Sequence, residues 1–253
     1  MSEHKSVILN GQVLHGADQL GRWKVTQLDG WNDSPPVKSQ DVARPNADGD
    51  FDLPINYGPR LVTIGGRVIC SSQAQAQRAR ARITGLVQGL VRVQIMDEGL
   101  TTWADVKLND AVTTKRTGTL VRFLYQLRAP EPRRYGDANP YSIPSGSAYT
   151  TLSHQGNAVG YPVIKVSGSF PGGYVLQSSA GAEYRVTTAL NATPHTIDMA
   201  TGLLVRNGSV VSGGVTRADL WRIQGASTAT DLRLQPITTG SGTAAVTLLN
   251  TYI

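Results

Sequence analysis

Hydrophobic and polar positions alternate along much of this chain and predict short β-strands. In the first half, the alternation covers residues 23–28, 61–69, 91–95 and 120–128. A strand with this pattern buries one row of side chains and leaves the opposite row in solvent. We therefore expect the first half to be built around half-buried strands.

One segment of the first half has helical periodicity instead. Apolar residues recur every three or four positions from Ala76 to Leu90, and Ser71 or Ser72 can cap the first turn. This spacing predicts one helix over residues 72–88. The first half is accordingly predicted to be α+β.

The second half shows only strand patterns. Asn207-Gly208 is a typical two-residue hairpin turn, because both of its positions need a positive φ. Eight short strands in about 95 residues predict an all-β sandwich. The expected strands are residues 161–167, 173–177, 183–187, 196–199, 203–206, 220–224, 231–236 and 243–252.

Two long polar segments interrupt these patterns. Residues 31–60 are rich in Pro, Asp and Gly, and loops longer than about 15 residues usually have a function. This segment has too few apolar residues to fold on itself. Residues 131–155 are rich in Pro and Gly and predict a linker. We therefore expect one domain over residues 1–130 and a second over 156–253.

The net charge of +6 raises the possibility of a nucleic-acid partner. Residues 1–150 carry 18 Lys and Arg against 14 Asp and Glu, and residues 151–253 carry 6 against 4, so the excess is +4 and +2. A nucleic-acid-binding protein usually concentrates its positive charge in a patch. The thin spread along the sequence argues against that class.

Residues able to support catalysis are scattered. The four histidines, His4, His15, His154 and His195, show no metal-ligand spacing, and the single cysteine, Cys70, ends an apolar run and is expected to be buried. The acidic stretch from Asp48 to Asp52 resembles a calcium loop only faintly, because the position of the bidentate Glu is Pro59. We expect no enzyme activity, no cofactor and no metal site.

The order of the segments resembles the distal tail protein family of long-tailed bacteriophages over nearly the whole chain. A short N-terminal strand pair is followed by the polar segment 31–60, a strand, a helix and a further strand. The motifs that carry the resemblance are Pro132-Arg133-Arg134-Tyr135, residues 161–168, Thr196-Ile197-Asp198, residues 203–208, Trp221 and the closing strand that ends at Ile253. No single motif is specific, and the resemblance depends on their order and spacing.

The resemblance implies an N-terminal ring domain, which is a tail-tube-like β-sandwich with one helix and a long hairpin arm, followed by a galectin-like sandwich. Six copies would form a ring around the DNA channel, with the arm clasping the neighbouring subunit. The segment 31–60 would be that arm, and its candidate inter-subunit residues are Trp31, Pro35, Pro36, Arg44, Phe51, Leu53 and Tyr57.

The partners implied by the resemblance are other copies of the chain, the major tail tube protein and the tail-tip hub protein. The tape measure protein and receptor-binding proteins are further candidates, and DNA would pass through without specific binding. We expect no signal peptide, because the N-terminal apolar run is short, and no membrane span, because no apolar run approaches about 20 residues. We expect synthesis in the host cytoplasm and assembly into the virion tail tip.

Two alternatives stay open. The chain could be a carbohydrate-binding adhesin, which would be monomeric and bind a glycan near Tyr174 or Tyr184. It could also be a related component of a tail or of a domesticated tail-like particle. A cell-wall hydrolase ranks below both, because no acid and base pair can be named.

Overall fold

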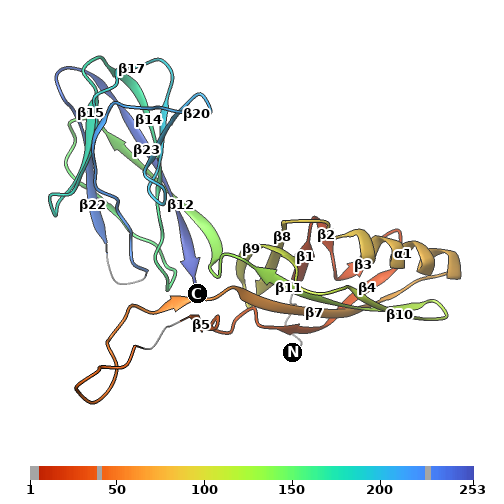
Figure 1. The fold of residues 1–253 in the computed structure, drawn as a ribbon. Coiled ribbons are helices and arrows are strands. Elements are labelled where there is room, and N and C mark those ends of the chain that lie inside the picture. Colours follow the sequence, from red (N-terminus) through yellow and green to blue (C-terminus); the bar gives the residue numbers. More distant parts are fainter. Residues whose placement is uncertain (1–5, 39–41, 226–228) are drawn as a thin grey trace. The chain divides into compact units, whose positions relative to one another are not determined.

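The computed structural model describes residues 6–38, 42–225 and 229–253 and divides into two compact units (Figure 1). The first unit comprises Met1–Arg134 with Ile253, and the second comprises Tyr135–Tyr252. His4 and three residues of the predicted arm, 39–41, lie outside the described residues.

The segment predicted as a linker, residues 131–155, is largely β-structure. It contains β12 (Arg134–Pro144) and β13 (Thr150–Leu152). The sequence pattern did not predict these strands, because the prolines and glycines of the segment interrupt the alternation of apolar residues. The chain passes from the first unit to the second between Arg134 and Tyr135, inside this segment.

The first unit holds two antiparallel sheets. One runs β2-β1-β8-β9 and the other runs β11-β7-β4-β3, with β10 and β9 pairing with different parts of the free edge of β11. The N-terminal pair β1 and β2 confirms the strand pair that the resemblance implied. The strands are β1 (Ser6–Leu9), β2 (Gln12–Val13), β3 (Gly16–Ala17), β4 (Arg22–Asp29), β7 (Arg60–Ile69), β8 (Val91–Asp97), β9 (Leu100–Leu108), β10 (Thr113–Thr117) and β11 (Leu120–Ala129).

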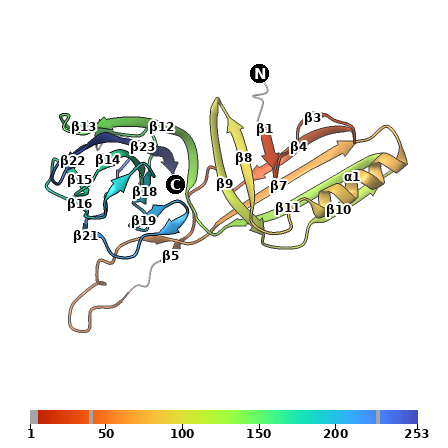
Figure 2. The same cartoon turned by 90° about the horizontal axis from the view of Figure 1, so that it is seen from above.

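The predicted helix is present as α1 (Gln73–Gly85) and lies beside β10 and β11 (Figure 2). Ser72 caps it, because its hydroxyl accepts a hydrogen bond from the backbone N–H of Gln75 at 3.2 Å. The buried side chains of α1 belong to the apolar stripe and join the core of the first unit. The Tyr125 hydroxyl of β11 donates to the carbonyl of Ile83 at 2.8 Å and fixes the end of α1 to the sheet.

The second unit is an all-β sandwich of two antiparallel sheets around its own core. One sheet runs β20-β19-β18-β14-β23-β12, with β17 also paired to β14, and the other runs β13-β22-β15-β16-β21. The remaining strands are β14 (Val163–Phe170), β15 (Tyr174–Ser178), β16 (Glu183–Val186), β17 (Leu190–Asn191), β18 (His195–Asp198), β19 (Leu203–Arg206), β20 (Ser209–Val210), β21 (Val215–Ala218), β22 (Thr230–Pro236) and β23 (Ser241–Tyr252).

Seven of the eight strands predicted in this half are present within a few residues, and the eighth is wrong. Residues 220–224 form no strand and make only one bridge, between Ile223 and Gly160. Trp221 and Ile223 are nevertheless buried, as the alternation indicated, because they pack into the core from a loop. The alternation of apolar residues therefore predicted the core positions correctly but predicted a strand that is absent.

The Tyr125 hydroxyl provides a test of the packing between α1 and the sheet. Burial raises its pKa, so the folded protein keeps this proton where unfolded tyrosine, with a pKa near 10, loses it. The stabilisation is complete below about pH 10 and is lost as the pH rises above that value. Tyr125→Phe should lower the free energy of unfolding by about 1 kcal/mol at about pH 8, and the deficit should nearly vanish by about pH 11.

Urea denaturation followed by circular dichroism measures this difference at both pH values. The control is Tyr57→Phe, because Tyr57 is 40% exposed on the arm. If the loss in free energy of unfolding caused by Tyr125→Phe is the same at both pH values, the buried Tyr125 hydroxyl does not stabilise the packing of α1 in this way.

Candidate functional site

Residues 31–60, here called the arm, leave the sheets of the first unit as one long antiparallel hairpin (Figure 1). Strand β5 (Val37–Lys38) pairs with β6 (Asn56–Tyr57), and Ala43 bridges Asp50 closer to the tip. The expectation that this segment could not fold on itself is therefore wrong for its backbone. A two-stranded hairpin alone is marginally stable in water.

The side chains of the arm have no core. Of the 17 large hydrophobic side chains exposed among the described residues, six lie between positions 37 and 57 of the arm. They are Val37, Val42, Phe51, Leu53, Ile55 and Tyr57, and Ile55 is 66% exposed. Such a concentration of exposed apolar surface is typical of an interaction site.

The base of the arm is held by Arg60, the first residue of β7. Arg60 is buried, and its Nη1 donates to the carbonyls of Gly30 at 3.1 Å and Trp31 at 2.9 Å, and also to that of Asp33. Its Nε donates to the carbonyl of Pro132 at 2.9 Å. One guanidinium thus joins both ends of the arm to the segment that precedes β12.

Burial and the positive charge of Arg134 lower the pKa of Arg60 to about 10. The group is still protonated at neutral pH. Its charge is held by carbonyl dipoles, because carbonyls at the outgoing end of the arm and the carbonyl of Pro132 point at it. A charged donor gains more from such bonds than a neutral donor does.

The outgoing end of the arm is anchored by Trp31. This side chain is 2% exposed, and its Nε1 donates to the Thr102 hydroxyl of β9 at 3.0 Å. Beside it, Nη1 of Arg134 donates to the Asn32 side chain at 2.7 Å. Arg134 belongs to the Pro-Arg-Arg-Tyr motif, so that motif contributes to the base of the arm.

Gly30 brings the two ends of the arm together. It has a φ of +78°, and a Cβ at this position would lie 2.0 Å from the carbonyl oxygen of Leu61. Only glycine combines this left-handed conformation with so close an approach of two backbones. The arm can therefore leave β4 and return to β7 at adjacent points.

The seven predicted arm residues fall into two groups. Trp31 and Pro35 are buried at the base within the single chain, and their predicted contact with a neighbouring subunit stays a prediction. Pro36, Arg44, Phe51, Leu53 and Tyr57 are exposed along the hairpin. The Arg44 guanidinium lies 5.8 Å from the centre of the Phe51 ring, and the two side chains share the tip half of the arm.

The second unit has a pocket of about 320 Å³ lined by Asn139, Tyr141, Ser153, His154 and Gln155. Its histidine is structural. His154 Nδ1 accepts from the backbone N–H of Gly156 at 3.1 Å, and Nε2 faces the carbonyl of Ile223 at 3.1 Å. Because both ring nitrogens are engaged, His154 is not available there as a general base.

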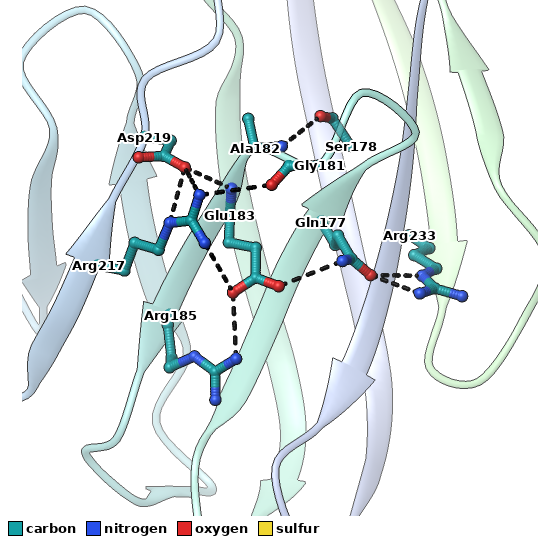
Figure 3. A network of polar contacts seen from close by, with 9 residues as sticks. All are labelled: Gln177, Ser178, Gly181, Ala182, Glu183, Arg185, Arg217, Asp219 and Arg233. Atoms are coloured by element: carbon teal, nitrogen blue, oxygen red, sulfur yellow. Dashed lines mark hydrogen bonds and ion pairs between the residues drawn. The ribbon is translucent and has the colours of Figure 1, made fainter.

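Polar side chains form a network on the sheet β13-β22-β15-β16-β21 of this unit (Figure 3). The Glu183 carboxylate accepts from Gln177 at 3.2 Å and from Arg185 at 3.1 Å, and forms an ion pair with Arg217. Arg217 also pairs with Asp219 at 2.7 Å. A hydrogen bond from the backbone N–H of Glu183 and one from Arg217 lower the pKa of Asp219. These charges neutralise one another and tie β15, β16 and β21 together.

The tyrosines that an adhesin would use are buried. Tyr174 and Tyr184 are 0% exposed, and their hydroxyls contact His195 Nδ1 at 3.2 Å and the carbonyl of Gly202 at 2.8 Å. Buried rings offer no platform for stacking against a sugar. Tyr174 and Tyr184 therefore do not themselves offer a stacking surface for a glycan in this structure.

Among the described residues, no group of three His, Cys, Asp or Glu side chains could hold a metal ion. Cys70 is buried, as its apolar surroundings indicated, and burial raises its pKa. In the same part of the chain, no helix is long and apolar enough to cross a membrane.

Comparisons with protein-family models and with curated proteins found no match. Among solved structures, the chain is similar to the Dit protein of phage SPP1, described as a paradigm of the hub adsorption apparatus in phages that infect Gram-positive bacteria. The TM-score is 0.76 at 15% identity, over 99% of this chain and 100% of that one.

Two structures of the phage p2 baseplate in its activated conformation, with Sr and with Ca, also match. Each has a TM-score of 0.53 and 8% identity, over 97% and 100% of this chain and 98% and 99% of the baseplate chains. At such identities the likeness shows a shared fold. This fold is mostly β-sandwich with one helix, and it is the fold of phage Dit and baseplate proteins.

Replacement of Arg60 tests the base of the arm. Arg60→Lys keeps the charge, but a single ammonium group cannot reach both the carbonyls at the outgoing end of the arm and that of Pro132. We expect a loss of about 2–3 kcal/mol in the free energy of unfolding, because buried and half-buried carbonyls lose their partner. Protease cleavage within the arm should also become faster.

The matched control is Arg44→Lys, since Arg44 is exposed on the same arm, and it should change the stability by less than about 0.5 kcal/mol. Urea denaturation measures both variants. An Arg60→Lys protein as stable as the control would show that this guanidinium does not hold the arm.

Proposed function

We propose that this protein is a structural component of a bacteriophage tail tip, and not an enzyme. Six copies form a ring that joins the tail tube to the tip proteins and surrounds the DNA channel. The first unit builds the ring, and its arm clasps the neighbouring copy. The fold shared with Dit and baseplate proteins supports a place in the tail tip.

The observation that carries the proposal is the arm. Its root is fixed by Arg60 and Trp31, while six large hydrophobic side chains farther along it are exposed. An extended segment with exposed apolar residues gains most when it lies across a second surface, which covers those residues and supplies partners for its backbone. A clasp between copies provides such a surface.

The other roles follow from the same proposal. The second unit is a galectin-like sandwich on the outside of the ring and carries receptor-binding proteins. The tube protein, the tip hub protein and the tape measure protein are the remaining partners. Its location is the virion tail tip, and DNA passes through the ring without sequence recognition.

Substitutions on the arm test the clasp. The triple variant Phe51→Ser, Leu53→Ser, Ile55→Ser removes exposed apolar surface without touching the base of the arm. We expect the wild-type protein to appear as hexamers in native mass spectrometry and the variant to appear as monomers. Burial of three such side chains contributes roughly 1.5–3 kcal/mol each per interface.

The control variant carries Val163→Ser, Leu203→Ser and Val210→Ser, three exposed positions of the second unit. It should keep the hexamer. Hexamers that persist in the arm variant would refute the clasp, and a wild-type protein that stays monomeric at high concentration would refute the ring.

A further inference from the structure

Four basic side chains stand in one row across the outer sheet of the first unit. The register pairs Lys115 of β10 with Arg122 of β11, Arg122 with Arg67 of β7, and Arg67 with Lys24 of β4. Directly paired residues point to the same face of a sheet. Neighbouring strands lie about 4.8 Å apart, so the row extends over about 14 Å.

This face is the one opposite the core. The residues that alternate with the row, such as Trp23, Val68 and Val121, are buried in the core of the unit. Lys24, Lys115 and Arg122 are exposed. The row therefore lies on the solvent side of the sheet.

Further basic residues extend the same face, here called the basic face. Arg22 pairs with Ile69 one step beyond Lys24, and near the other end of β11 Arg128 pairs with Lys107 of β9. Asp29 is the one acidic residue that the register places on this face between the two ends of β7. The basic face consists of Arg22, Lys24, Arg67, Lys107, Lys115, Arg122 and Arg128.

The positive charges of the basic face are not neutralised within the chain. Across the described residues, none of its seven side chains forms an ion pair, and the Nε of Arg67 is buried without a hydrogen-bond partner. Like charges directly opposite each other destabilise a sheet. The repulsion between these side chains is not relieved by a counter-charge within the chain, so the row is suited to bind an external anion.

We propose that the basic face binds the phosphate backbone of double-stranded DNA without reading its sequence. Lys and Arg are accompanied on this face by Thr63, Gln27 and Gln126, and hydroxyl and amide side chains commonly contact phosphate oxygens. Protein interfaces instead concentrate aromatic anchors and are poor in Lys. Its exposed aliphatic residues, Leu61 and Ile69, lie at opposite ends of β7.

All residues of the binding surface belong to one copy, so the surface is complete without the arm of a second copy. Contacts made only to phosphate are weak at physiological salt and let a protein slide along the duplex. Such contacts are compatible with DNA that moves past the protein. Strand pairing gathers on one face basic residues that are far apart in the sequence, so the thin spread of charge along the chain does not by itself argue against such a surface.

The test is fluorescence anisotropy with a labelled duplex of about 20 base pairs, titrated between about 50 and 200 mM NaCl. The test variant is Lys24→Gln, Lys115→Gln, Arg122→Gln, and the control is Arg78→Gln, Lys165→Gln, Arg222→Gln, three exposed positions elsewhere. Both lose three charges. For the test variant, the dependence of log K on log salt should be less steep than wild type by about two to three units.

The control should bind as the wild type does. If the two triple variants bind DNA equally, or if the wild type does not bind at low salt, the proposal is wrong. If the test variant loses self-association while its DNA affinity is unchanged, the face is a contact between copies and the proposal is also wrong. Should the triple variant melt at a lower temperature than wild type, Arg122→Gln alone is measured, with an expected change of about one unit in slope.

Discussion

The arm depends on one buried guanidinium. Arg60, at the returning end of a 30-residue excursion, donates to carbonyls at its outgoing end and to that of Pro132, so a single charge fixes where the arm leaves and re-enters the sheet. Replacing its fork of donors with any other side chain would leave several buried or half-buried carbonyls without this partner. Because the root is held by these hydrogen bonds, the exposed side chains of the arm are presented from a fixed point.

This anchoring divides the arm into two parts with different chemistry. At the root, Trp31 and Gly30 satisfy the demands of a folded core, namely burial, hydrogen bonding and close backbone approach. Beyond the root, the backbone pairs with itself but the apolar side chains remain in solvent. A segment with a fixed root and exposed apolar side chains is suited to bind a second molecule.

Sequence patterns predicted elements whose signal is local. The strand Leu203–Arg206 and the Asn207-Gly208 turn are present as expected, with φ of 49° and 78° at the turn. The strand β9 was missed because its buried row includes Thr102 and the small Ala104, while Trp103 lies in the opposite row, so the two rows differ little in hydrophobicity. The role of Arg60 and the basic face depend on contacts between distant segments, which no local pattern records.

In the proposed ring, a second copy of the chain covers the arm. Hydrogen–deuterium exchange of the arm amides, followed at rising protein concentration, measures that coverage directly. If the arm is covered in this way, residues 42–57 exchange fast in the monomer and are strongly protected when the protein assembles, with little change in the core strands. Equal exchange of the arm in monomer and assembly would contradict this coverage.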